Sequence, residues 1–167
     1  MTILVKRAAV AILPASLAGA AVMAPYLSAG GYSLSVLAIF WFFSPVCHQD
    51  PARSFWIIGA PVAVCARCLG IYVGAALGAF LDASRRTVLI ALAAALALNL
   101  AEWLTELAGL HGVWMAPRFV LGAALGAAFG ALLAGSSGVS PARMKLAGAT
   151  PAGKRNSRPQ SSPPPGR

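Results

Sequence analysis

Apolar residues fall into five runs along the chain, separated by short polar or turn-forming stretches. The runs cover residues 8–27, 30–46, 61–81, 87–107 and 117–134. Crossing a hydrocarbon core of about 30 Å takes about 20 apolar residues in a helix. Backbone polar groups in lipid must pair within the chain, and helices satisfy this requirement. The pattern therefore predicts an all-α, polytopic transmembrane helical bundle.

Two of these runs leave alternatives open. The run at residues 30–46 is short and Pro45 interrupts it, so it is a further span, a re-entrant segment or an interfacial helix. The bundle then has four spans, or five. The first run resembles a signal peptide at Ala18-Gly19-Ala20, but it continues past that point, which favours a retained anchor.

Composition supports this fold class, with 59% hydrophobic and only 10% charged residues. The net charge of +9 does not indicate a nucleic-acid partner, because six of the thirteen basic residues lie after Ala142 without interleaved aromatic residues. We expect membrane lipids as partners instead. Residues 1–135 form the predicted transmembrane helical domain. Residues 136–167, rich in Ser, Pro and Arg, form a predicted disordered cytoplasmic tail.

Basic residues also predict the orientation, because short cytoplasmic loops retain Lys and Arg. Arg85 and Arg86 lie between the runs at 61–81 and 87–107, and the basic tail follows the last run. Both therefore belong inside. The segment between the runs at 30–46 and 61–81 is then expected outside.

That outer segment holds the candidate chemistry. Cys47-His48 precedes a Cys-x-x-Cys pair, Cys65 and Cys68. The four residues form a Cys3His set that suits zinc or another thiophilic ion. A helix beginning at Pro61 would place the pair near its amino terminus, where the helix dipole and Arg67 lower a thiol pKa.

Two other interpretations of the cysteines remain open. Cys65 and Cys68 are a candidate redox pair for thiol-disulfide exchange, with Cys47 as a further thiol, and an outer location is oxidising. Alternatively, the cysteines form a structural disulfide or pack as small buried side chains. In that case the protein is a structural partner subunit without chemistry of its own.

Polar residues elsewhere are expected on the same outer face. They are Arg53, Arg67, Glu102, Thr105 and Arg118. Arginines at headgroup depth can fork onto a lipid phosphate or another anion. They can equally pair with Glu102 and Glu106, which lie one turn apart.

Two series of glycines recur every four residues and predict close helix packing. The positions are Gly70, Gly74, Gly78, Gly122, Gly126 and Gly130. Their faces suit neighbouring helices, a homo-oligomer or a partner membrane protein.

The cysteine stretch also resembles a known family. The motifs Cys47-His48-Gln49, Arg53-Ser54-Phe55 and the string VCARCLGIYVG are similar to the signature of the domain of unknown function 2085 family, a group of small bacterial membrane proteins. The similarity extends over about residues 40–130. The resemblance implies a bacterial inner-membrane protein with a shared polar site, and it implies no assigned reaction.

The second half of the chain departs from that family pattern. Thr105, Gly109, Arg118 and Gly122 match it, while Glu102 stands where the family has Asp. Further replacements occur at Glu106, Val113, Met115 and Leu121. The sequence thus predicts a small inner-membrane protein with an outward-facing Cys/His site.

Overall fold

The computed structural model describes residues 2–135 of the chain. Within these residues the helices are α1 (Thr2–Ala29), α2 (Ser33–Phe43), α3 (Ala66–Gly78), α4 (Arg85–Leu107) and α5 (Met115–Gly135). A 3-10 turn, η1 (Pro51–Arg53), and two strands, β1 (Trp56–Ile57) and β2 (Ala60–Pro61), lie between α2 and α3. The predicted tail at residues 136–167 lies outside the described residues.

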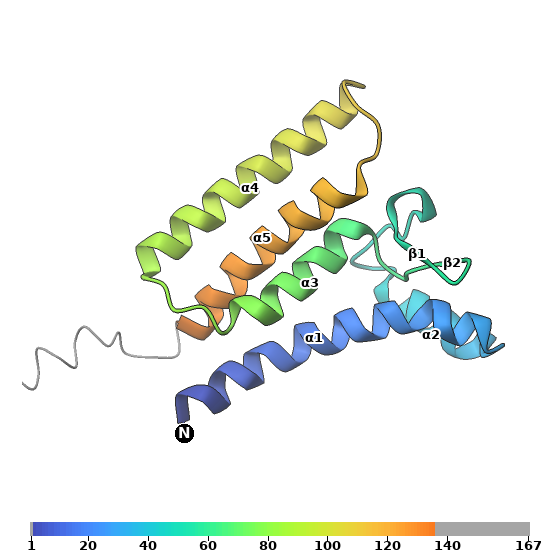
Figure 1. Ribbon diagram of the computed structural model, residues 1–167, viewed down its shortest axis with the longest axis horizontal. Coiled ribbons are helices and arrows are strands. Elements are labelled where there is room, and N and C mark those ends of the chain that lie inside the picture. The colour runs from blue at the N-terminus through green and yellow to red at the C-terminus, as the bar shows by residue number, and fades with distance from the viewer. Residues whose placement is uncertain (1, 136–167) are drawn as a thin grey trace, which may run out of the picture.

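Three of the described helices, α1, α4 and α5, are long and apolar enough to cross a membrane. α3 lies beside α5 and α1 in the same bundle (Figure 1). The prediction of an all-helical transmembrane fold is confirmed. The sequence did not predict the small antiparallel pair β1–β2, which turns at two left-handed residues, Ile58 and Gly59.

The run at residues 30–46 forms only the short helix α2. Its 11 residues rise about 16 Å, roughly half of a hydrocarbon core. Gly31, with φ of +79°, ends the preceding helix, and α2 then packs against α1. The chain after α2 returns to the same end of the molecule (Figure 1). This length favours the re-entrant and interfacial alternatives over a fifth span.

The predicted span at residues 61–81 is wrong at its amino end. Pro61 is not in a first helical turn, because it belongs to β2 opposite Trp56, and the helix begins only at Ala66. Val62, Ala63 and Val64 are fully buried in a non-helical segment that bends at Ala63 and Val64. The 13 residues of α3 therefore rise about 20 Å, so this helix is shorter than a full crossing.

The six spaced glycines bring the backbones of α3 and α5 into contact. A Cβ atom added at Gly74 would lie 2.1 Å from the carbonyl oxygen of Ala123, and one at Gly126 would lie 2.1 Å from that of Ile71. Gly70, Gly78, Gly122 and Gly130 face backbone atoms of the opposite helix at similar distances. Both glycine faces are thus occupied within one chain, and a contact between copies would use another surface.

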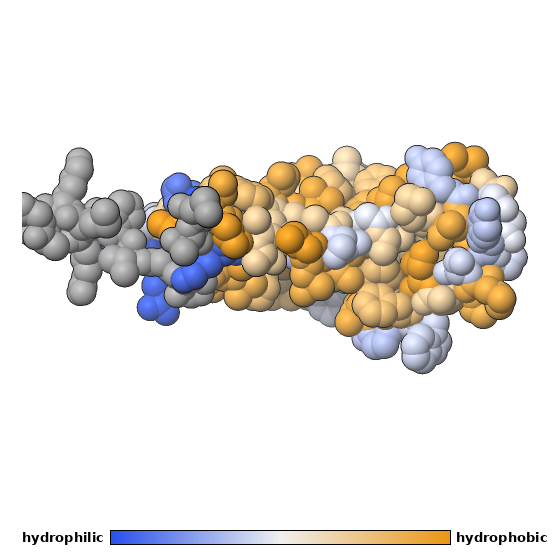
Figure 2. Space-filling model, turned by 90° about the horizontal axis from the view of Figure 1, so that it is seen from below, coloured by the Kyte–Doolittle hydropathy of each residue, from blue (hydrophilic) through white to orange (hydrophobic). Residues whose placement is uncertain are grey.

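Polar groups gather at the two ends of the molecule, and an apolar belt lies between them (Figure 2). One end holds the start of α1, the α3–α4 turn and the end of α5 (Figure 1). There Arg7 pairs with Asp82, and its hydrogen bond holds the pKa of that carboxyl below its usual range. The opposite end holds the cysteine-bearing segment and the α4–α5 loop (Figure 1).

Substitution of Gly74 by Ala tests the α3–α5 contact. The new Cβ would meet the backbone of Ala123, which cannot rotate away, so we expect a loss of about 1–3 kcal/mol in unfolding free energy. Gly19→Ala in α1 is the matched control, because nothing lies within 4 Å of its added Cβ. Thermal unfolding in detergent measures both variants. Equal midpoints for the two variants would contradict the contact.

Candidate metal centre

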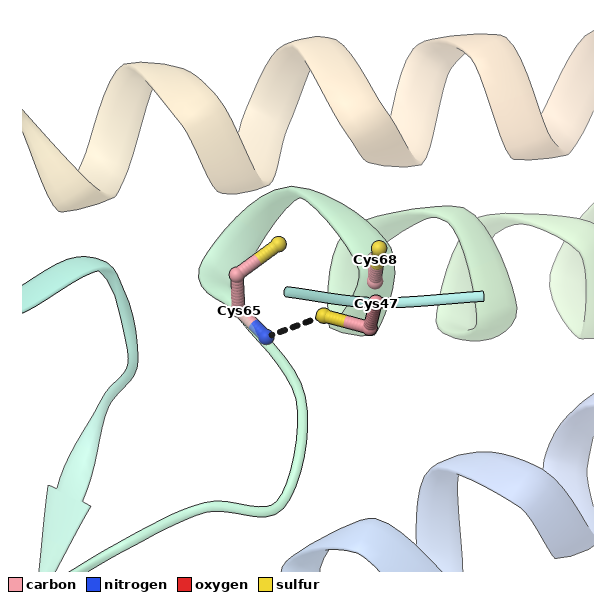
Figure 3. A group of neighbouring side chains, drawn as sticks. All are labelled: Cys47, Cys65 and Cys68. Atoms are coloured by element: carbon pink, nitrogen blue, oxygen red, sulfur yellow. Dashed lines mark hydrogen bonds between the residues drawn. The ribbon is translucent and has the colours of Figure 1, made fainter. Parts of the chain in front are cut away.

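All three cysteines meet at the start of α3. Cys47 comes from the segment after α2, Cys65 is the residue that precedes α3, and Cys68 lies in its first turn (Figure 3). Their Sγ atoms all lie within 4.8 Å of one another. The three thiols are free, with Cys47 buried and the other two partly buried. The structure therefore brings the predicted cysteines together.

Gln49 holds the segment that delivers Cys47. Its backbone is left-handed, with φ of +52°, a conformation uncommon for this residue type. Its side-chain Nε2 donates to the carbonyl of Phe40 at 2.7 Å and to that of Ala63 at 3.0 Å. One amide thus joins the end of α2 to the segment that leads into Cys65. Gln49 was not among the predicted site residues, although it adjoins His48 in the family-like motif.

A proline in α1 leaves a hydrogen-bond acceptor for the segment that leads into Cys65. Pro25 lies inside α1 and has no N–H, so the carbonyl of Ala21 lacks its usual helical donor four residues on. The backbone N–H of Ala63 donates to this carbonyl at 3.2 Å. Pro25 is itself fully buried. The cysteine-bearing chain is therefore hydrogen-bonded to the side of a membrane helix.

The surroundings of Cys47 favour its thiolate. The backbone N–H of Cys65 donates to Cys47 Sγ at 3.3 Å, as the dashed line in Figure 3 marks. Hydrogen bonding from the thiols of Cys65 and Cys68, together with that N–H, lowers the pKa of Cys47 well below its usual range. The contribution expected from Arg67 is offset, because Arg67 pairs with Glu102.

The three sulfurs have a spacing that a metal ion could use with little movement. A tetrahedral zinc site with Zn–S bonds of about 2.3 Å needs sulfurs about 3.8 Å apart. His48, the fourth predicted ligand, is exposed and is not part of the group. Adjacent residues rarely reach one ion together, and the left-handed turn at Gln49 follows directly. The described residues thus supply three ligands and leave one position for another donor.

The predicted polar residues form a chain of ion pairs beside the cysteines. Arg118 Nε lies 3.1 Å from Glu102 Oε1, and Arg53 Nη2 lies 3.1 Å from Glu106 Oε1. Arg118 also pairs with Glu106, and Arg67 pairs with Glu102. The order along the network is Asp50, Arg53, Glu106, Arg118, Glu102 and Arg67. Pairing with Glu106 was one of the predicted alternatives, whereas Asp50 was not predicted.

This network does not favour an anion site. Each of its three arginines already faces a carboxylate, so none offers an uncompensated charge to a phosphate. The side chain of Arg118 is only 5% exposed, and a buried guanidinium needs such partners. Pairing with Glu102 and Glu106 is therefore the role that the structure gives these arginines.

Thr105 lies apart from the ion pairs. Its hydroxyl lies 2.9 Å from His111 Nε2, and the His111 ring stacks on Trp114 with centroids 5.1 Å apart. These contacts close the α4–α5 loop. Nearer the middle of α4, Asn99 is buried and donates to the carbonyl of Leu121 at 3.0 Å, which links α4 to α5.

Comparison with known proteins agrees with this architecture. Residues 47–132 match the family described as "Predicted membrane protein (DUF2085)". The chain belongs to this family. It is also 41% identical over 61 residues to an uncharacterized protein of Methanocaldococcus jannaschii. That alignment covers 34% of this chain and 39% of the relative, so the chain spans well under two thirds of that protein. No solved structure matches it.

Replacement of Gln49 by Ala tests the support of the Cys47 segment. Loss of two hydrogen bonds to carbonyl groups, with Ala63 itself buried, should lower the unfolding free energy by about 1–3 kcal/mol and expose Cys47 to maleimide. His48→Ala is the control, because that side chain is exposed. Denaturant unfolding and the labelling rate of Cys47 are the measurements. A Gln49 variant that matches the control in both would contradict this role.

Proposed function

We propose that this protein is a membrane metal-binding protein whose Cys47, Cys65 and Cys68 hold a thiophilic ion such as zinc. The observation that carries the proposal is the gathering of three free thiols within 4.8 Å. Thiolate is the form that binds such ions. Family membership assigns no reaction, so the proposal rests on these residues.

Charge balance supports a divalent ion. Three thiolates and a divalent cation carry a net charge of −1, which the amino terminus of α3 and the N–H of Cys65 can stabilise. A monovalent ion would leave −2 in a site where Cys47 is buried. The fourth position would take water or a donor from another molecule, as in zinc sites that keep one position open.

A second candidate function is thiol-disulfide exchange, and the closeness of Cys47 to the Cys-x-x-Cys pair favours it. One thiolate would attack a partner's disulfide and form a mixed disulfide, with release of one partner thiolate. A second cysteine thiolate would then attack the mixed disulfide. The products would be a disulfide in this protein and a reduced partner.

Purification in detergent without oxygen or chelator separates these two functions. We expect about one thiophilic ion per chain and, after denaturation with chelator, three free thiols. Cys47→Ser, Cys65→Ser and Cys68→Ser should each lose the ion, whereas His48→Ala should retain it. Mass spectrometry counts the metal, and a thiol reagent counts the cysteines. Absence of metal with only one free thiol would reject the metal site in favour of a disulfide.

The site is proposed to face the outside of a bacterial inner membrane. Lys6, Arg7, Arg85 and Arg86 lie at the opposite end of the chain's bundle, which supports a cytoplasmic position for that end. The proposal follows from this charge distribution.

Labelling of introduced cysteines tests this orientation. In a chain whose three cysteines are replaced by Ser, Gly112→Cys should react with an impermeant maleimide in intact cells. Ala83→Cys should react only after the membrane is opened. Both positions are exposed and lie in loops at opposite ends of α4. The reverse labelling pattern would contradict the orientation.

A further inference from the structure

The ion-pair network has its two ends in the two segments that carry the cysteines. Asp50 follows Cys47 by three residues, and Arg67 lies between Cys65 and Cys68. Between Arg53 of the loop and Arg67 of α3, the members come from α4 and α5, which contribute no cysteine. The network therefore links Cys47 to the other two cysteines by a path through different helices.

On the loop side, Arg53 provides the connection. Its Nε lies 3.4 Å from Asp50 Oδ2, and its Nη2 lies 3.1 Å from Glu106 Oε1. The side chain of Asp50 also accepts a hydrogen bond from the N–H of Ala52 at the start of η1. The Cys47 segment is thus fixed to α4 at Glu106, a residue whose side chain is 12% exposed.

On the helix side, Arg67 provides the matching connection. It pairs with Glu102, one turn before Glu106 on α4. Arg118 of α5 bridges the two carboxylates, since it pairs with both. Glu102 and Glu106 therefore place the two cysteine-bearing segments against adjacent turns of one rigid helix.

The charges of this network are balanced, which makes each buried member dependent on the others. Three arginines face three carboxylates, and Arg118, Glu102 and Glu106 are nearly buried. Neutralising one carboxylate leaves a guanidinium without its full compensation in a poorly solvated place. The remaining side chains then rearrange. Rearrangement is easiest in the loop, because Arg53 and Asp50 are the most exposed members of the network.

We propose that Glu106 and Arg53 are positioning residues for the metal centre: their ion pair holds the Cys47 segment so that its sulfur stays beside Cys65 and Cys68. The inference rests on the proposed metal-binding function. It assigns metal affinity in part to α4, whose residues do not belong to the thiol group. Groups hydrogen-bonded directly to metal ligands typically change metal affinity 10–100-fold when removed. The Arg53–Glu106 pair acts through the loop backbone, so we expect an effect near the lower end of that range.

The first test is zinc affinity in the full chain, measured by competition with a chelator in detergent. We expect Glu106→Gln and Arg53→Gln each to weaken binding about tenfold or more. The double variant should be no weaker than the worse single variant, because both changes break one link. Arg53→Lys keeps the positive charge, so it should bind zinc more tightly than Arg53→Gln does. If the losses of zinc affinity in the two single variants add up in the double variant, Glu106 and Arg53 do not act through one ion pair, and the inference is overturned.

A stability control separates positioning from general unfolding. Gly78→Ala destabilises α3–α5 packing at the end of α3 opposite the cysteines, where its Cβ would lie 2.1 Å from the carbonyl oxygen of Ala127, so it should lower the unfolding midpoint and retain the affinity of the native chain. Cobalt substitution supplies a second readout, since the thiolate-to-cobalt absorption depends on how many sulfurs bind. We expect reduced intensity in Glu106→Gln and an unchanged spectrum in Gly78→Ala. If the glycine variant loses affinity and absorption as much as Glu106→Gln does, Glu106 has a general structural role and is not a positioning residue.

The native chain distinguishes failure of this inference from failure of the proposed function. Equal zinc affinity in the native chain and Glu106→Gln would reject the inference alone. A native chain that binds no zinc would reject the proposed function, and the inference is then tested by cross-linking. A mild oxidant should join Cys47 to Cys65 or Cys68 in the native chain, and at least threefold less in Glu106→Gln. Equal yields would overturn it.

Discussion

The hydrogen bond from Ala63 N–H to the carbonyl of Ala21 shows the constraint on which the cysteine site depends. Non-helical chain inside an apolar bundle must find partners for its backbone groups, since each unpaired group costs several kcal/mol in lipid. Pro25 deprives that carbonyl of its usual helical donor four residues on. The site is therefore built where a membrane helix offers a free acceptor to a segment that needs one.

The same constraint explains why the cysteines lie at the start of a short helix. The chain at residues 62–65 is not helical, so α3 begins at Ala66 with Cys65 as its N-cap residue. The N–H of Cys65 donates to Cys47 Sγ. Glycines then fix α3 against α5, with the carbonyl of Arg67 opposite Gly122. This contact at the start of α3 fixes the position of the cysteine site along α5.

Features that depend on local composition could be predicted from the sequence, and features that depend on distant partners could not. Hydrophobic runs predicted the long helices, and the Cys-x-x-Cys spacing predicted that Cys65 and Cys68 lie close together at the start of a helix. Pro61 was misplaced because its strand partner, Trp56, and the acceptor for Ala63 are not visible in the local pattern. His48 was included by residue type alone, whereas the turn at Gln49 leaves it exposed.

A buried network of ion pairs is a costly way to stabilise a fold, because desolvation of the charges can exceed the attraction between them. Apolar side chains in place of Glu102 and Glu106 would fill similar space on α4 without that cost. Apolar contacts, however, are not directional, and they would permit the Cys47 segment to slide against the helix. Paired charges with fixed partners permit fewer arrangements. A site that must keep three sulfurs from two segments within 4.8 Å gains more from that restriction than from stability.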